Sequence, residues 1–456
     1  MALYQAHKKI YSKSVTGLFA RWRWFFVFLT QAVYYGVPWL VWGDRQAILL
    51  DLVARRFYIF GLVLYPQDVI YLTGILIISA LSLFLFTAIA GRQWCGYTCP
   101  QTVYTEIFMW IERKIEGDRS AHMRLDASPM SGAKFARKAL KQLAWIALAL
   151  WTGFTLVGYF TPIRELGAHV VNFNLGPWET FWIFFYGLAT YGFAGFMREQ
   201  VCKYMCPYAR FQSAMFDRDT LIVSYDNTRG EPRGARSRKA DPRALGLGDC
   251  VDCTLCVQVC PTGIDIRKGL QYECISCAAC IDVCDGVMDK LGYAKGLIGY
   301  TTENGMNNGW TRQQIWRRVF RPRVLLYMGI LGCIIAAFIT SLLLRTPFKV
   351  DVVRDRATLA RLVAGGQIEN IYRIQIMNAT EKPQTFKLSV DGLDGLALAS
   401  ESEVTVGGAQ AQWVPVQLRA PYDVGASGSH PIRFRIESAV GSVTEKSVFF
   451  VPGTRQ

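Results

Sequence analysis

The sequence is poor in histidine and lacks the motifs of common soluble enzymes. It has four histidines in 456 residues, His7, His122, His169 and His430. They do not form the spaced pair that haem ligation would need. No Gly-rich loop of the phosphate-binding kind is present, and no Ser/His/Asp arrangement suggests nucleophilic catalysis. Haem proteins, nucleotide hydrolases and serine hydrolases are therefore not expected, and the four histidines are expected to have ordinary hydrogen-bonded or surface roles.

Acidic residues are also scarce relative to basic ones. The chain has 35 Asp and Glu against 50 Lys and Arg, which gives a formal net charge of +15. Hydrophobic residues make up 52% of the chain, a content typical of membrane proteins. The basic residues flank apolar runs, which fits attraction to anionic lipid better than nucleic-acid binding. Membrane lipid is thus an expected partner, and nucleic acid is not.

Charge is absent over several stretches long enough to cross a bilayer. About 20 apolar residues in a helix span the hydrocarbon core. No cleavable signal peptide is evident, and Phe57–Gln67 is uncharged but too short to span, which suggests an interfacial or re-entrant piece. Five membrane spans are predicted, at Trp24–Trp42, Val69–Ala90, Gln142–Ile163, Thr180–Met197 and Val324–Leu344.

The loops between these spans alternate in their content of basic residues. The loop 91–141 holds nine Lys or Arg, against three in 43–68 and one in 161–178. Basic loops stay in the cytoplasm. The N-terminus and the cysteine-containing segments 95–99, 202–206 and 246–292 are therefore predicted to be cytoplasmic. Five spans then place the C-terminus on the outer side, which is the periplasm for a bacterial inner membrane. Iron–sulfur thiolates need a reducing compartment, which agrees with this orientation for the cysteine runs described next.

Twelve of the thirteen cysteines fall into two sets. The first set forms two runs of C-x2-C-x2-C-x3-C, the spacing of bacterial two-cluster ferredoxins, in which the fourth cysteine of each run completes the other cluster. The alternative is a pair of four-cysteine zinc knuckles. Asp285 stands where proline usually follows the second run, and this removes no ligand. The spacing predicts one [4Fe-4S] cluster on Cys250, Cys253, Cys256 and Cys284, and a second on Cys274, Cys277, Cys280 and Cys260.

The second set comes from an internal repeat. Twice the chain makes two spans, then an arginine, then Cys-x3-Cys-Pro, which gives Cys95 and Cys99, and then Cys202 and Cys206. Proline favours the first position of a helix, so the second cysteine of each pair should lie at a helix N-terminus, which favours a thiolate. Soft thiolates suit Cu(I), zinc or an iron–sulfur cluster. The alternative is that these are reduced structural cysteines.

Two sulfur-containing residues outside these sets, Met205 and Cys333, lie near or within the apolar spans. Met205 could add a thioether ligand, although packing is the simpler role for it, and Cys333, inside an apolar span, is expected to be a small core residue.

The last part of the chain, 346–456, contains no cysteine and differs in composition from the rest. It shows alternating runs separated by turn residues, the pattern of an immunoglobulin-like β-sandwich. The predicted strands are Asn370–Met377, Gln384–Val390, Gln412–Leu418, Ile432–Ile436 and Ser442–Phe450.

The predicted fold is therefore a multi-domain membrane protein with five helical spans, a cytoplasmic two-cluster ferredoxin-like α+β insert and a C-terminal all-β immunoglobulin-like domain. The division is a membrane domain 1–217, a basic linker 218–245, the ferredoxin-like domain 246–292, a basic linker 293–323, a fifth span 324–344 and the periplasmic domain 346–456.

This combination closely resembles the FixG/CcoG/RdxA family, accessory proteins in the assembly of cbb3-type cytochrome c oxidase. The resemblance covers essentially the whole chain and rests on twelve cysteines. It implies reduction of Cu(II) to Cu(I) for the oxidase, with Cys95, Cys99, Cys202 and Cys206 as the reactive site. The implied partners are copper ion, oxidase assembly factors, copper transporters or chaperones, and an unidentified cytoplasmic electron donor. A homodimer is left open.

The membrane half also resembles the NapH and NosR polyferredoxin proteins, which share the Cys-x3-Cys-Pro pattern. Two alternative functions follow. The protein could conduct electrons between quinol and a redox partner, or it could be a non-catalytic assembly scaffold.

Overall fold

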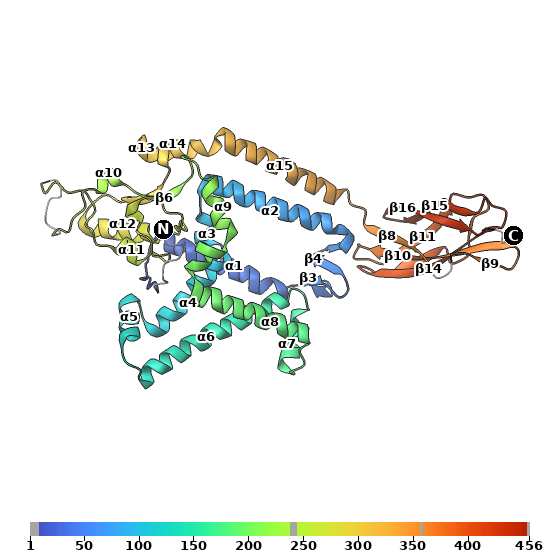
Figure 1. Cartoon of the computed structure of the whole chain (residues 1–456), viewed down its shortest axis with the longest axis horizontal. Helices are drawn as coiled ribbons and strands as arrows, with labels where there is room; N and C mark the ends of the chain where they lie inside the picture. The colour runs from blue at the N-terminus through green and yellow to red at the C-terminus, as the bar shows by residue number, and fades with distance from the viewer. Residues whose placement is uncertain (1–8, 238–243, 356–358, 454–456) are drawn as a thin grey trace. The chain divides into compact units, whose positions relative to one another are not determined.

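The computed structural model describes residues 9–237, 244–355 and 359–453 (Figure 1). His7 and residues 238–243 of the basic linker therefore lie outside the described residues. The chain divides into two compact units. Unit 1 comprises Met1–Leu40 and Leu72–Ala336, and unit 2 comprises Val41–Tyr71 and Ala337–Gln456. Each unit is described separately below.

The first half of unit 1 is helical, and its longer helices are the apolar ones. Four helical segments in the described chain are long and apolar enough to cross a membrane: Pro66–Ala90, Gly132–Val157, Pro177–Met197 and Pro322–Leu343. The helices of this half are α1 (Leu18–Gly36), α2 (Val69–Ala90), α3 (Gln93–Tyr97), α4 (Pro100–Glu116), α5 (Arg119–Ala127), α6 (Gly132–Val157), α7 (Ile163–Val171), α8 (Pro177–Thr190) and α9 (Pro207–Met215), with π-helical turns η3 (Tyr191–Met197) and η4 (Val201–Met205).

The first predicted span, Trp24–Trp42, is wrong as a continuous helix. Helix α1 begins earlier, at Leu18, and ends at Gly36. A short 3-10 turn with Pro38 at its second position follows, and the chain then enters a strand pair. Proline removes a backbone donor and interrupts the helical hydrogen bonding. Because α1 includes Arg21 and Arg23, it is less apolar than the other four segments, and it is not among the candidate spans.

The predicted third span is displaced toward the C-terminus by several residues. The sequence places it at Gln142–Ile163, whereas α6 starts at Gly132 and ends at Val157. Ser131 caps its first turn by accepting a hydrogen bond from the Lys134 N–H. Good helix formers between the cap and Gln142 extend the helix into the basic segment, and Pro162 precedes the next helix, α7.

The second half of unit 1 carries the eight-cysteine segment. Strands β6 (Ile222–Tyr225) and β7 (Ile298–Thr301) pair antiparallel on either side of it in the sequence. Its helices are α10 (Asn227–Gly230), α11 (Leu255–Gln258), α12 (Ala279–Leu291), α13 (Glu303–Asn307), α14 (Arg312–Arg317) and the start of α15 (Pro322–Leu343).

This segment packs directly against helices α1 and α3, so it is not merely tethered by linkers. The Asp282 carboxylate, on α12, accepts hydrogen bonds from the N–H groups of Phe19 at 3.1 Å and Ala20 at 2.7 Å. Helix α1 has no side-chain cap of its own, so Asp282 caps it from another helix. Tyr97 and Tyr300 add a hydroxyl contact at 3.2 Å.

Unit 2 is an immunoglobulin-like sandwich, in agreement with the sequence. One sheet has the order β12-β14-β10-β8, with β9 also paired to β10, and the other has the order β13-β11-β15-β16. All five predicted strands are present, and four more strands accompany them. The bounds are β8 (Phe348–Arg354), β9 (Arg361–Val363), β10 (Gln367–Asn378), β11 (Gln384–Asp391), β12 (Ala397–Leu398), β13 (Glu403–Val406), β14 (Ala411–Pro421), β15 (Gly428–Ser438) and β16 (Gly441–Val451).

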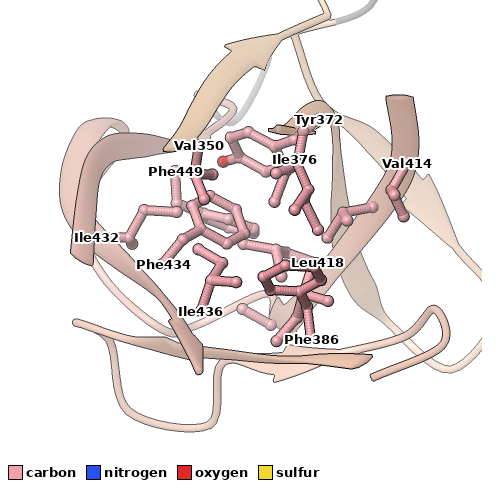
Figure 2. Close-up of a cluster of buried hydrophobic side chains, with 14 of the residues drawn as sticks. Val350, Tyr372, Ile376, Phe386, Val414, Leu418, Ile432, Phe434, Ile436 and Phe449 are labelled. Atoms are coloured by element: carbon pink, nitrogen blue, oxygen red, sulfur yellow. The ribbon is translucent and has the colours of Figure 1, made fainter. Parts of the chain in front are cut away.

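The core of the sandwich is formed by alternate residues of both sheets (Figure 2). Tyr372, Phe386, Phe434 and Phe449 are fully buried in it. Aromatic pairs such as Tyr372–Phe434, with ring centroids 5.1 Å apart, fill the space between the sheets.

Unit 2 also includes an early part of the chain, Val41–Tyr71, which the sequence does not assign to the C-terminal domain. Phe57–Gln67 forms strands that pack on the C-terminal domain, so it is not a re-entrant piece. It belongs to a three-stranded sheet of β3 (Ile48–Asp51), β4 (Arg56–Ile59) and β5 (Leu62–Leu64), after the short pair β1 (Val41–Trp42) and β2 (Arg45–Gln46). Tyr65 donates a hydrogen bond to the Asn378 carbonyl at 3.0 Å, and the buried Asp68 pairs with Arg345 at 2.7 Å.

Candidate iron–sulfur and thiol site

The eight-cysteine segment lines two cavities of similar size. The cysteines at the first are Cys250, Cys253, Cys256 and Cys284. The cysteines at the second are Cys260, Cys274, Cys277 and Cys280, with Cys256 also at its wall. Each quartet combines three cysteines of one run with the fourth of the other, the grouping predicted from spacing. Apart from the thiols and the Thr262 hydroxyl, the second cavity has apolar walls.

The two cysteine runs have the same unusual backbone. Asp252 and Thr254 flank Cys253 with φ of 53° and 56°, and Ser276 and Ala278 flank Cys277 with φ of 54° and 59°. Positive φ is uncommon for residues other than glycine and persists where the surroundings impose it. Because the strain occurs at equivalent positions, both runs are shaped for the same kind of group.

Sulfur spacing separates a cluster from a single metal ion. Zinc–thiolate bonds of about 2.3 Å in a tetrahedron place the sulfurs about 3.8 Å apart. Among the described residues, no three cysteine sulfurs lie within 4.8 Å of one another. The quartets are therefore too open for zinc knuckles, and both the donor set and the cavities fit [4Fe-4S] clusters.

In each repeat, one cysteine lies in a short helical turn and the other directly precedes the next helix. Cys95 lies in α3, and Cys99 immediately precedes Pro100 of α4. Cys202 lies in the π-helical turn η4, and Cys206 precedes Pro207 of α9. The helix starts are as predicted. Burial and the charges of the three other thiols raise the pKa of Cys202 to about 12, so the four sulfurs interact electrostatically.

The surroundings of Cys99, at the predicted helix N-terminus, act on its thiol in opposite directions. Burial raises the pKa of the Cys99 thiol, and this outweighs hydrogen bonds from the backbone of Thr102 and Gln101 that lower it. Burial likewise raises the pKa of Cys95 to about 11, against the lowering effect of Arg92. A metal ion bound here would therefore have to displace thiol protons.

The repeat cysteines and the second cavity are in direct contact. Cys95 packs with Val259, Ile275 and Cys277. Next to it, a Cβ atom on Gly96 would lie 2.6 Å from the Ile275 carbonyl oxygen and 2.9 Å from Cys277 Cα. Only glycine permits this approach, so α3 is held against the backbone of the cysteine loop.

A buried arginine connects the same two groups. Arg92 is 4% exposed, and its Nε donates a hydrogen bond to Gln212 Oε1 at 2.8 Å. Its guanidinium also donates to the carbonyl of Tyr272, close to Cys274. The Cys95 thiol lies 3.5 Å from Gln212 Oε1. Since Gln212 is on α9, an element of the second repeat supports a cysteine of the first.

A third cavity is lined by residues of both cysteine sets. Cys202 and Cys277 both line it, together with the charged residues Arg23, Glu106, Arg198 and Glu199. Sequence reasoning missed Arg23 and Glu106 because basic and acidic residues beside an apolar run look like ordinary membrane flanks.

Glu112, Glu116 and His122 form another cluster that sequence reasoning missed. Their ligand atoms lie within 4.8 Å of one another. Glu116 already pairs with Lys138 at 2.7 Å and with His122 at 2.8 Å, and Glu112 pairs with Arg198 at 2.9 Å. The cluster is a buried ion-pair network rather than a free metal site. His122 thus has a hydrogen-bonded role, as expected.

Two sulfur residues outside the cysteine sets are exposed. Cys333, on α15, is exposed, so its predicted place in a core is wrong. Met205, the last residue of η4, directly precedes Cys206 and is 49% exposed, so it is not a core residue.

Comparison with known proteins agrees with this architecture. Residues 197–303 match a family model described as a 4Fe-4S dicluster domain, and residues 72–117 match a 4Fe-4S binding domain. Residues 338–452 match the "IG-like fold at C-terminal of FixG". A crystal structure of a FixG-related protein from Vibrio parahaemolyticus is also similar, with 25% identity and a TM-score of 0.21, covering 23% of this chain and 95% of that one.

Three curated relatives extend the comparison. "Ferredoxin-type protein NapH" of Haemophilus influenzae is 28% identical over 197 residues, 40% of this chain and 65% of the relative. "Nitrogen fixation protein FixG" of Rhizobium meliloti is 39% identical over 438 residues, 89% of this chain and 83% of the relative. "Protein RdxA" of Cereibacter sphaeroides is 39% identical over 454 residues, 96% of this chain and 95% of the relative. With this identity over most of both chains, the protein belongs to the FixG/RdxA family.

Proposed function

We propose that this membrane iron–sulfur protein is a cupric reductase, in which Cys95, Cys99, Cys202 and Cys206 receive the copper ion. Cu(II) gains one electron there and becomes Cu(I), and a one-electron donor in the cytoplasm loses it. Soft thiolates bind Cu(I) better than Cu(II), so the four sulfurs favour the product. The proposal extends to the role implied by the family resemblance, delivery of Cu(I) during assembly of a cbb3-type oxidase.

The cluster assignments are part of this proposal. Two [4Fe-4S] clusters would be held by Cys250, Cys253, Cys256 and Cys284, and by Cys260, Cys274, Cys277 and Cys280. When bound, such clusters supply one-electron storage and transfer. The protein holds the two cysteine sets next to each other. Gly96 allows α3 to approach the backbone at Cys277, and Cys95 packs on the same loop. This contact between the two cysteine sets is the observation that carries the proposal.

The test replaces Cys95, Cys99, Cys202 and Cys206 together with alanine and uses Cys333→Ala as the matched control, because Cys333 belongs to neither set. Purified protein is reduced with dithionite under anaerobic conditions, separated from excess dithionite on a desalting column, and mixed with Cu(II). We expect the fourfold variant to keep its iron and its cluster EPR signals but to lose copper-dependent reoxidation, while the control behaves as the wild type. Undiminished cupric reductase activity in the fourfold variant would overturn the assignment.

A second candidate function is electron transfer between quinol and a redox partner. The match to NapH over 197 residues favours it. In that case a quinone would reoxidise the reduced clusters and Cu(II) would not. A scaffold without redox function would instead support oxidase assembly when its cluster ligands are replaced.

We also propose that α1 is a fifth crossing, so that the ferredoxin-like segment is cytoplasmic and the C-terminal domain periplasmic. The alternation of basic residues between the loops supports this orientation, and the segments that contain α2 and α15 are apolar enough to span. The 19 residues of α1 are about 28 Å long, close to the thickness of the hydrocarbon core. A membrane-impermeant maleimide should label Asp44→Cys but not Ser128→Cys in intact cells, and the reverse result would refute this topology.

A further inference from the structure

Arg23, on α1, is a buried cation without a full set of partners. It is 8% exposed, and its Nε has no hydrogen-bond partner among the described residues. Burying a charge is unfavourable unless an opposite charge compensates it. The compensating charge for Arg23 must therefore lie nearby.

Two carboxylates, Glu106 and Asp282, and the Cys277 sulfur interact electrostatically with Arg23, and Asp282 also accepts hydrogen bonds from the start of α1. Arg23 lines the third cavity with Glu106, Arg198 and Glu199. Of these carboxylates, Glu106 interacts most strongly with Arg23, but it already forms an ion pair with Arg113 at 3.1 Å. Arg198 adds a further positive charge, which pairs with Glu112 at 2.9 Å.

On its other side Arg23 faces the cysteine loop of the second cavity. The two cavities share Pro261, Thr262, Ile275 and Cys277 as walls. A [4Fe-4S] cluster held by four thiolates is negatively charged, and reduction makes it more negative. In an apolar site a nearby fixed positive charge stabilises the reduced state strongly, because little solvent screens it.

We propose that Arg23 raises the reduction potential of the cluster held by Cys260, Cys274, Cys277 and Cys280. This inference rests on the cluster assignment made above. Arg23 is a positioning charge rather than a ligand: it favours the reduced state of the cluster whose loop contacts Cys95 and Gly96. Reduction adds one electron to that cluster, and the guanidinium stays protonated throughout.

Among the described residues that line the first cavity, the cation is Arg267, which is already paired. Its guanidinium is bonded to Asp265 at 2.8 Å and also to Asp252. These two carboxylates neutralise it. The effect of Arg23 should therefore appear in one of the two clusters only.

The test is an EPR-monitored redox titration of the intact protein with dithionite and mediators. In Arg23→Gln, the ratio of reduced to oxidised second cluster at a given potential should fall at least tenfold, a shift of the midpoint of about 59 mV. Arg23→Lys should retain most of the wild-type midpoint. Arg21→Gln is the matched control, because Arg21 lies on the same helix and is exposed, and it should leave both midpoints unchanged.

A variant of opposite sign covers the case in which Arg23→Gln loses its cluster. Glu106→Gln removes the negative charge opposed to Arg23 and should raise the same midpoint. The inference is overturned if neither variant moves a midpoint beyond the Arg21→Gln control. A wild-type protein without two EPR-active clusters would instead refute the proposed function, so the two failures are distinguishable.

Discussion

Replacement of Gly96 by alanine is the most direct test of the contact between the two cysteine sets. The added Cβ would lie 2.6 Å from the Ile275 carbonyl oxygen, whereas ordinary contact begins at 3.4 Å. The difference, 3.4 minus 2.6, requires α3 and the loop to separate by about 0.8 Å. The opposing atoms are backbone and cannot rotate away, so we expect a loss of stability of about 1–3 kcal/mol, as for other overpacked sites.

The functional consequence of Gly96→Ala should exceed its effect on stability. A displacement of about 1 Å of positioned reacting groups can lower a rate by about 100-fold. All twelve cysteines of the two sets remain, so iron content and EPR signals should not change. Reoxidation of the dithionite-reduced protein by Cu(II), followed by stopped-flow absorbance, should slow by between tenfold and 100-fold.

The matched control for this variant is Gly286→Ala. Gly286 lies in the middle of α12, and a Cβ there would meet no atom within 4 Å. Alanine in a helix interior is more favourable than glycine by about 1 kcal/mol, so this variant should be at least as stable as the wild type and should react at the same rate. If Gly96→Ala matches Gly286→Ala in stability and rate, the close approach is not what couples the two sets.

Three further predictions follow from contacts described above. Asp282→Ala should lower stability by about 1 kcal/mol through loss of the cap on α1, measured by thermal unfolding in detergent against Asp289→Ala, whose exposed carboxylate makes only a surface pair. Phe434→Ala in the core of unit 2 should lower the free energy of unfolding by about 3–5 kcal/mol, with the exposed Val440→Ala unchanged in the same urea titration. Burial tends to raise the pKa of Glu116, but hydrogen bonds from His122, Lys138 and Lys141 lower it to about 2 from 4.5. The ionised Glu116 therefore stabilises the fold above pH 4.5, and this contribution is lost as the pH falls toward 2. Glu116→Gln should remove this part of the acid sensitivity, and an unchanged acid transition in that variant would contradict the assignment.

Cysteine spacing predicted the most about the site. The rule that the fourth cysteine of one run joins the other run groups Cys260 and Cys284 as the two cavities do. The strands of unit 2 were predictable for a similar reason, because their alternation is a local signal. The prolines at residues 100 and 207 likewise mark the starts of α4 and α9.

The contacts that join these parts were not predictable, because they connect residues far apart in the chain. Asp282 caps a helix more than 260 positions earlier, and Gly96 contacts the loop at Cys277. Neither residue differs from an ordinary helix or turn residue in its local sequence. Arg23 was predicted to flank a membrane span, and only its burial distinguishes it from Arg21.

The composition of unit 2 has a consequence for the order in which the protein is made. Arg45 and Glu381 form an ion pair although 336 residues separate them. At about 5–20 residues per second, Glu381 is synthesised about 17 to 67 seconds after Arg45. During this time the β3–β5 sheet has been synthesised, but the residues of the C-terminal domain on which it packs have not. Unit 2 can complete its fold only when synthesis is nearly finished, and a chain truncated before β8 would leave Leu49, Tyr58 and Tyr65 uncovered and open to proteolysis.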